Sequence, residues 1–284
     1  MAQAPYPQPV DSPTDDLADT AKATAREILK APSLLSFLAS KQRNTLGGLP
    51  KGVKHPAVAL LNKYVEEGIP AHTGAPWSPE SLATAISKGT HASACTPEMT
   101  SFVRGELRRR IKDGFSILLP VADAMQLFGR RLNLSRIVAV PQSHRRPCLV
   151  LNLSMQPYSD TIGVNETTNR EAAPDLLQFG WAFSRILQAV WEADPVQGLF
   201  RVSKLYVTDA YHRGTIAPAQ LGAFAYVIPS VPGYEGIFIC IDLVLLMGWV
   251  DSPKFFCAFF GNANRCGKFP GELRAPCPVL RRNI

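Results

Sequence analysis

Two adjacent arginines, Arg145 and Arg146, are the clearest candidates for binding chemistry in this sequence. They lie in the segment PQSHRRPCLVLN, residues 141–152, where a basic turn separates two apolar runs. A guanidinium group is planar, keeps its charge at physiological pH and presents a fork of donors that fits phosphate oxygens. The pair therefore indicates a phosphate clamp, and a solvated hairpin without a ligand is an equal alternative.

Two later segments place polar residues where an apolar run ends. The run KLYVTDAYHR, residues 204–213, predicts a strand that ends in polar residues. In LLMGWVDSPK, residues 245–254, Gly248 and the pair Ser252 and Pro253 predict a turn that leads into a helix. Each segment also fits a purely structural role, as an ordinary strand end or an ordinary turn.

Several familiar reaction chemistries have no motif in this sequence. It contains no GxxxxGK[ST] phosphate loop, no GxGxxG after a strand, no GxSxG and no HExxH. The six cysteines lie far apart and form no CxxC pair, which is typical of reduced thiols. The five histidines are scattered and are interpreted as surface or structural residues. We therefore expect no cofactor.

Taken in order, the three segments resemble the fingers and palm of reverse transcriptases from retroelements and retroviruses. In that family a basic fingers hairpin precedes motif A, a strand whose metal-binding Asp is followed five residues later by an aromatic gate. Motif B follows and reads Gly-(Trp or Leu)-x-x-Ser-Pro. The matching positions are Arg145 and Arg146 in the hairpin, Asp209, Ala210 and Tyr211 in motif A, and Gly248, Trp249, Ser252 and Pro253 in motif B. The resemblance covers about residues 95–260, and more loosely 55–95. It implies that the arginines contact phosphate or template and that the motif A and B residues bind a nucleotide.

Two departures from the family pattern affect catalysis. Counting back five residues from Tyr211 gives Tyr206 at the position of the motif A metal ligand, and a neutral phenol is a poor ligand for a hard cation. A register that makes Asp209 the ligand would move the gate to about Gly214, so we reject it. Motif C, an aromatic residue before a paired Asp-Asp, has no match after Phe260. The intact family uses two Mg²⁺ ions held by these carboxylates, so the resemblance implies that this chain has no catalytic residue and no metal site.

The elements that must position these residues change type along the chain. Apolar spacing with cap and stop signals predicts helices over about 15–30, from Pro56 to Gly68, from Ser78 to Gly89 and from Thr96 to Lys112. Short apolar runs predict strands near 115–119, 136–140, 148–151, 204–209, 222–228 and 236–241, with helices over about 174–193 and 252–260. With the resemblance, this predicts an α+β fold, in which an N-terminal helical region precedes a partial right-hand polymerase fingers and palm with a mostly antiparallel sheet.

We expect four parts along the chain. Residues 1–13 form a flexible arm rich in Pro and Gln, and residues 14–94 form the N-terminal helical region. Residues 95–260 form the reverse-transcriptase-like fingers and partial palm, and residues 261–284 form an irregular tail without periodicity. The tail suggests a truncated reading frame.

The charge and hydropathy of the sequence indicate which partners the chain can bind. Residues 104–146 contain ten basic and three acidic residues, so this segment carries as much net charge as the whole chain, +7. Such a segment favours weak, sequence-independent binding of nucleic acid. The N-terminus has no signal-peptide pattern, and the longest apolar run, 236–250, contains Asp242 and is too short to span a bilayer. We therefore expect an intracellular protein with no membrane partner.

The expected function follows from the resemblance and its departures. The sequence predicts a truncated, inactive reverse-transcriptase-like protein from a retroelement, whose ancestral activity was RNA-directed DNA synthesis. One alternative is a non-catalytic remnant that binds nucleic acid. Another is an inert, partly folded product of a decayed element, because a palm sheet without its motif C hairpin has an open edge.

Overall fold

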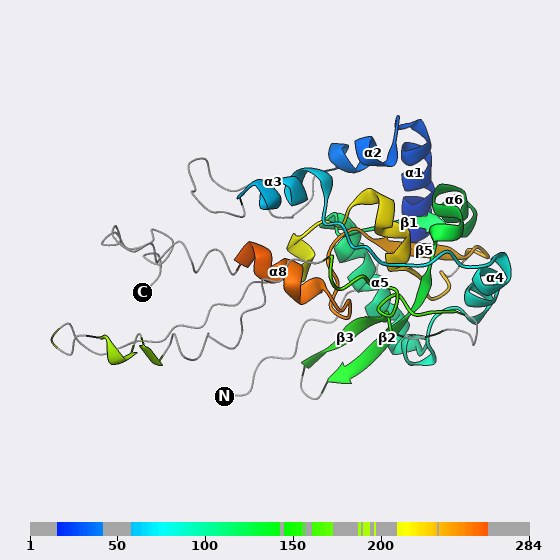
Figure 1. Ribbon diagram of the computed structural model, residues 1–284. Helices are drawn as coiled ribbons and strands as arrows, with labels where there is room; N and C mark the ends of the chain where they lie inside the picture. Colours follow the sequence, from blue (N-terminus) through cyan, green and yellow to red (C-terminus); the bar gives the residue numbers. More distant parts are fainter. Residues whose placement is uncertain are drawn as a thin grey trace.

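Helices precede a five-stranded sheet in this chain (Figure 1). The computed structural model describes residues 16–41, 58–142, 145–154, 156, 161–172, 187–188, 190–193, 196, 209–231 and 233–260. The α-helices are α1 (Leu17–Lys30), α2 (Leu34–Ser40), α3 (Val58–Glu67), α4 (Pro79–Lys88), α5 (Pro97–Lys112), α6 (Val121–Phe128) and α8 (Ser252–Phe260). The strands are β1 (Ser116–Pro120), β2 (Leu134–Gln142), β3 (Arg145–Asn152), β4 (Ala225–Val227) and β5 (Phe238–Asp242).

The predicted helices α1, α3, α4, α5 and α8 are confirmed, and the starts of α4 and α5 follow from local signals. The Ser78 hydroxyl accepts a hydrogen bond from the Ser81 amide at 3.1 Å at the start of α4. The Thr96 hydroxyl does the same for the Met99 amide at 3.3 Å at the start of α5. Both helices have Pro in the first turn, where no backbone donor is needed. The short helices α2 and α6 were not predicted.

The sheet is mixed and mostly antiparallel, with strand order β1-β5-β4-β2-β3. β1 pairs with β5, β5 with β4, and β2 with β3, all antiparallel, whereas β2 and β4 run parallel. The registers include Leu118 opposite Cys240 and Ala139 opposite Leu149. The expected α+β fold with a mostly antiparallel sheet is therefore confirmed.

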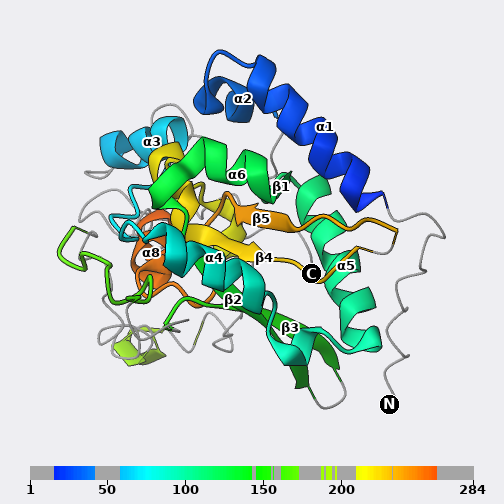
Figure 2. The same ribbon diagram turned by 90° about the vertical axis from the view of Figure 1, so that its right-hand side faces the viewer.

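Helices cover the sheet around β1 and β5. All five residues of β5 are buried, as are the first four residues of β1, so both faces of these strands are covered. α1 packs against β1 through its buried face of Leu17, Ala21, Ala25 and Ile28, and Figure 2 shows α1 and α2 along one side of the molecule. The buried residues of the helical region and of the sheet form one hydrophobic cluster.

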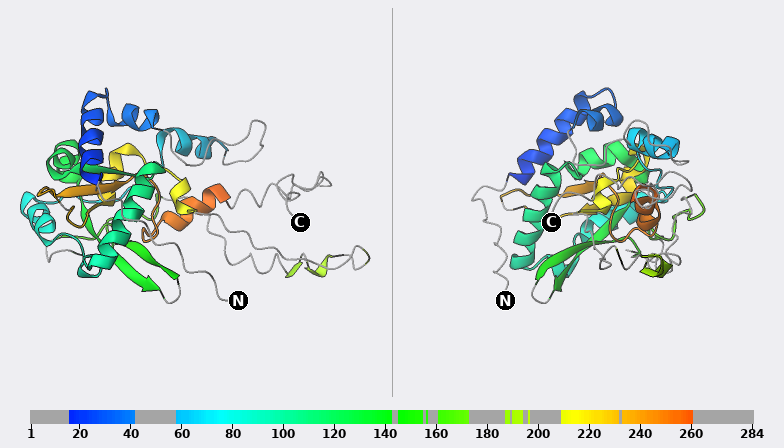
Figure 3. Two further views of the ribbon diagram at one scale, coloured as in Figure 1. Left: turned by 180° about the vertical axis from the view of Figure 1, so that it is seen from behind. Right: turned by 90° about the vertical axis from the view of Figure 1, so that its left-hand side faces the viewer.

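The β2–β3 hairpin extends beside α5, as the views from the front and from behind both show (Figures 1 and 3). The predicted strands near 115–119, 136–140, 148–151 and 236–241 correspond to β1, β2, β3 and β5. The strand expected over 222–228 is shorter, because a 3₁₀ helix (Pro218–Phe224) occupies its first part and leaves β4. No helix in the described part of the chain combines the length and the hydropathy needed to cross a bilayer.

Some expectations lie outside the described residues. These are the flexible arm over 1–13, the tail over 261–284 and most of the helix expected over 174–193. The strand expected over 204–209 is also outside, except for its last residue. That residue, Asp209, lies in a turn with φ +52°.

Candidate functional site

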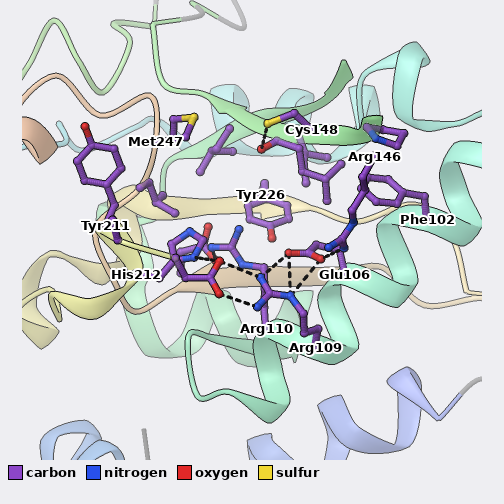
Figure 4. Close-up of a pocket in the computed structure, with 18 residues that line it drawn as sticks. Phe102, Glu106, Arg109, Arg110, Arg146, Cys148, Tyr211, His212, Tyr226 and Met247 are labelled. Atoms are coloured by element: carbon purple, nitrogen blue, oxygen red, sulfur yellow. Dashed lines mark hydrogen bonds and ion pairs between the residues drawn. The ribbon is translucent and has the colours of Figure 1, made fainter. Parts of the chain in front are cut away.

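The three segments singled out in the sequence contribute to one cavity of about 410 Å³, here called the α5 cavity (Figure 4). Its floor comes from α5, with Tyr226 of β4 and Asp242 of β5, and its other walls come from β2, β3, the turn at 209–212 and the residues before Gly248. The cavity is lined by Phe102, Glu106, Arg109, Arg110, Ile137, Arg146, Pro147, Cys148, Leu149, Leu151, Asp209, Ala210, Tyr211, His212, Tyr226, Asp242, Leu246 and Met247. Segments far apart in the sequence therefore meet beside one helix.

Not every predicted site residue reaches this cavity. Arg146, Asp209, Ala210 and Tyr211 line it. The residues expected to match motif B do not line it, and instead form the adjoining turn and the start of α8; they are Gly248, Trp249, Ser252 and Pro253. The side chain of Arg145, at the start of β3, and the whole of Tyr206 lie outside the described residues.

The floor of the α5 cavity is a network of ion pairs centred on Arg109. Its guanidinium donates to Glu106 at 2.7 Å, to Asp113 at 3.1 Å and to Asp209 at 3.0 Å. Glu106 also accepts from Arg146 of β3. The Glu106 side chain is 11% exposed, so these contacts are partly shielded from water. The network fixes α5 to β3 and to the turn that contains Asp209.

These contacts favour the charged form of both carboxylates in the network. Burial alone would raise the pKa of Glu106, but the hydrogen bond and charge of Arg109, with the charge of Arg146, lower it overall. Asp209 behaves in the same way, because Arg109 outweighs its burial and lowers its pKa. Both groups are therefore ionised and paired at neutral pH.

A second, fully buried pair lies at the base of the cavity. Arg110 donates to Asp242 at 2.8 Å, and the Ser116 hydroxyl donates to the same carboxylate oxygen at 2.5 Å. Burial raises the pKa of Asp242 against the opposing charge of Arg110. The Tyr226 side chain lies between this charged floor and the Met247 and Cys148 side chains on the opposite side of the cavity (Figure 4). Burial also raises the pKa of the Tyr226 hydroxyl group. Asp242 thus interrupts the apolar strand β5 to hold a charge from α5.

His212 is a neutral group within this charged surrounding. Burial disfavours its imidazolium form, and the nearby charge of Arg110 adds to the effect, so its pKa is lowered from 6.5 to about 4. The ring packs against Phe115 with centroids 5.3 Å apart. Its Nδ1 lies 3.5 Å from Asp209. At neutral pH His212 adds no charge to the cavity.

The turn before α8 requires glycine at position 248. Gly248 has φ +113°, and a Cβ there would lie 2.9 Å from the carbonyl oxygen of Leu151. An L-residue would therefore be strained both in its backbone and by contact with β3. The expected turn is confirmed, and it lies directly over a strand of the cavity wall.

Asn165 holds this turn from outside. Its side-chain amide donates to the Gly248 carbonyl at 2.8 Å and to the Ser154 hydroxyl at 2.7 Å. Its carbonyl oxygen accepts from the Val250 amide at 3.0 Å. The side chain thus connects the end of β3 to both sides of the turn. Asn165 lies in the short segment at 164–167, which connects these two parts of the fold.

Trp249 anchors the same turn in the core. Its indole ring is stacked on Phe255 with centroids 5.6 Å apart and meets Phe224 edge-on at 5.5 Å. The indole N–H donates to the Thr168 hydroxyl at 3.1 Å. Trp249 is 1% exposed, so its role in this structure is packing.

The donor set of the cavity does not fit Mg²⁺. Mg²⁺ sites use carboxylate oxygens in near-octahedral geometry. Of the carboxylates that line the cavity, Glu106 and Asp209 share Arg109, and Asp242 is held by Arg110. Among the described residues, no three His, Cys, Asp or Glu side chains converge as a metal site.

Sequence reasoning did not find the α5 side of the site. The sequence does contain one signal for these ion pairs, which is opposite charges three and four residues apart: Glu106 with Arg109, and Arg109 with Asp113. Such a pattern is common on solvated helices, so it does not indicate a cavity. Asp242 was noted only because it interrupts an apolar run, and its partner Arg110 is 132 residues away.

Comparisons with known proteins do not assign the site. No protein-family model matches the chain, and no curated protein gives a significant match. The functional interpretation therefore depends on the residues of the α5 cavity.

Proposed function

We propose that this chain is a reverse-transcriptase-like protein, with the fingers and part of the palm, that does not catalyse nucleotidyl transfer. The observation that supports this proposal most is the convergence of the three motif segments around the α5 cavity. The segments come from residues 141–152, 204–213 and 245–254, and nothing in their local sequence requires them to meet. Their meeting is expected if they correspond to a fingers hairpin, motif A and motif B.

The absence of catalysis follows from the side chains available for the metals. Nucleotidyl transfer with two metal ions needs carboxylates that hold both ions and so stabilise the attacking and leaving oxygens. Tyr206 stands where the resemblance places the first of these carboxylates. Asp209, the nearest carboxylate in the cavity, is bound to Arg109 at 3.0 Å. A divalent ion there would meet a guanidinium that already neutralises the carboxylate.

Primer extension tests this proposal. The full chain is incubated with an RNA template, a DNA primer, all four deoxynucleoside triphosphates and either Mg²⁺ or Mn²⁺. Incorporation is expected to equal that of a Tyr206→Ala control, and Tyr206→Asp alone is expected not to restore activity. Incorporation by the wild-type chain above the control would overturn the proposal.

Weak nucleic-acid binding is a second candidate function, and it depends on the surface charge. Much of the charge of residues 104–146 is used within the fold, because Arg108 bonds to Asp16 and Arg136 donates to the Lys88 carbonyl. Arg109, Arg110 and Arg146 are paired in the cavity, as described above. In contrast, Arg130 and Arg131 are exposed on the 3₁₀ turn that follows α6, and they favour contact with a phosphate backbone.

Fluorescence anisotropy with a single-stranded oligonucleotide tests this second candidate. With about two phosphate contacts, the logarithm of the binding constant should fall with that of the salt concentration with a slope near −1.4. The double variant Arg130→Gln, Arg131→Gln should lose most of this slope. A flat salt dependence, or no binding at low salt, would remove nucleic-acid binding as a function.

A further inference from the structure

The charged groups that line the α5 cavity neutralise one another. Three guanidinium groups face three carboxylates there, in the pairs Arg109 with Glu106 and Asp209, Arg146 with Glu106, and Arg110 with Asp242. The neutral imidazole of His212, which also lines the cavity, adds no charge. The polar floor therefore offers hydrogen-bonding groups without a net positive field.

Glu106 is bound to the guanidinium group of Arg146, which would otherwise attract a phosphate. Arg146 bonds to Glu106 and lies over the Phe102 ring, with its guanidinium carbon 5.1 Å from the ring centroid. A phosphate group on Arg146 would have to displace the Glu106 carboxylate, which is only 11% exposed. This displacement is unfavourable because it separates a shielded carboxylate from one of its two guanidinium partners and leaves it paired with Arg109 alone.

The rest of the cavity suits a flat, mostly apolar group. Figure 4 shows Tyr211 and Phe102 toward opposite ends, with Met247 and Cys148 above the charged floor. Tyr211 is held edge-on against Phe256, with centroids 5.2 Å apart. The volume of about 410 Å³ is within the range of small-molecule sites, about 300–1,000 Å³. Aromatic and thioether side chains pack well against planar rings.

We infer that the α5 cavity binds an uncharged nucleoside and that Glu106 excludes the corresponding triphosphate. The heterocycle lies against the aromatic and apolar walls, and the hydroxyl groups of the sugar donate to the carboxylates of the floor. The choice of a nucleoside rests on the proposed reverse-transcriptase relationship, whereas the preference for an uncharged ligand rests on the ion pairs alone. The cavity thus takes a different ligand from the one that a polymerase with metal ions requires.

Isothermal titration calorimetry of the full chain, without divalent metal, tests the inference. The ligands are 2′-deoxyadenosine, dATP and inorganic tripolyphosphate. The wild-type chain is expected to bind deoxyadenosine most tightly and tripolyphosphate least. Tyr211→Ala is expected to weaken deoxyadenosine binding about tenfold through the loss of stacking. Unchanged affinity in Tyr211→Ala would overturn the assignment to this cavity.

Glu106→Gln tests the exclusion of phosphate, and Asp113→Asn is its matched control. Both substitutions remove a carboxylate from Arg109, but Asp113 does not line the cavity. Glu106→Gln should raise the affinity for dATP and tripolyphosphate at least about tenfold, whereas Asp113→Asn should keep the wild-type order of ligands. An equal gain in both variants, or no gain in Glu106→Gln, would overturn the role of Glu106. Circular dichroism checks that both variants fold. If Glu106→Gln does not fold, Arg146→Gln replaces it, because it removes the guanidinium that Glu106 binds, and its dATP affinity should then stay at the weak wild-type level; a large loss would show that Arg146 already binds phosphate in the wild-type chain and would overturn the role of Glu106.

The two proposals fail in different experiments. Wild-type binding of dATP or tripolyphosphate in preference to deoxyadenosine, or no binding of deoxyadenosine at millimolar concentration, would overturn the inference and leave the primer-extension result unaffected. Incorporation in the primer-extension assay would overturn the proposed function, and the order of ligand affinities would still be judged by calorimetry.

Discussion

Replacing His212 with Phe should remove a large part of the pH dependence of stability in mildly acidic solution. The shift in the pKa of His212 from 6.5 to about 4 corresponds to roughly 3 kcal/mol, at about 1.4 kcal/mol for each pKa unit. The side chain is 17% exposed, so solvent screens this effect only in part. Phe keeps an aromatic ring against Phe115 and carries no titratable group.

The sign follows from which state binds the proton. Above about pH 6.5 His212 is neutral in the folded and the unfolded chain, so its full contribution to stability is present. As the pH falls, the unfolded chain binds a proton that the folded chain does not, and the free energy of unfolding decreases. The loss is about 2 kcal/mol at about pH 5 and reaches its full size below about pH 4. The pKa values of Glu106 and Asp209 are lowered from their ordinary acidic values, so their contributions are lost in a more acidic range.

Urea denaturation at a series of pH values measures this effect. The wild-type chain should lose about 2 kcal/mol between about pH 7.5 and 5, whereas His212→Phe should lose much less. His72 is exposed, so His72→Asn serves as a control and should follow the wild-type curve. An equal loss in wild type and His212→Phe would refute the assignment of this pH dependence to the buried imidazole. A cooperative transition in these curves would also argue against an inert, partly folded product.

Two further predictions concern the turn at Gly248 and the buried pair of Arg110 and Asp242. Gly248→Ala should lower the free energy of unfolding by about 2 kcal/mol or more, because its φ is +113° and the new Cβ would meet the Leu151 carbonyl. Gly129→Ala, at φ +54° with no atom within 4 Å of the Cβ, should cost only about 1 kcal/mol, and equal losses by urea denaturation would contradict the role of the close contact. Asp242→Asn should cost about 3–5 kcal/mol because it leaves the buried Arg110 without a counter-charge. The double variant Arg110→Met, Asp242→Leu should recover much of this loss, and full additivity of the single losses would disprove the coupling.

The elements that sequence predicted well have signals within a few residues. α4 and α5 each begin at a Ser or Thr followed by Pro, and α4 ends at a glycine. The two helices that were missed are short. α6 follows β1 directly, with Pro120 as its N-cap and no side-chain cap bond. α2 does have a cap, because the Ser33 hydroxyl accepts a hydrogen bond from the Ser36 amide at 3.1 Å, but the helix spans only Leu34–Ser40 and so has little periodicity. A capping residue therefore predicted a helix only where a longer periodic run followed it.

The candidate site was predictable only where side chains belonged to a recognisable segment. Arg146 was singled out from its own segment and Tyr211 from the family resemblance, and both line the α5 cavity. Their neighbour Glu106 was not, because its contact with Arg146 joins residues 40 positions apart and depends on the β2–β3 hairpin lying beside α5. The role of Arg146 therefore differs from the phosphate contact that the sequence predicted, because Glu106 neutralises its charge.

The position of β5 in the sheet determines when the fold can form during synthesis. β5 is the last described strand in the chain, yet it lies between β1 and β4 and pairs with both. Ser116 of β1 must wait for Asp242, 126 residues later, which takes on the order of 10 s at ordinary translation rates. Throughout that interval the edge of β1 lacks its partner and can pair with another nascent chain. A ribosome that stops before residue 238 would therefore release a chain whose β1 and β4 have no strand to join them.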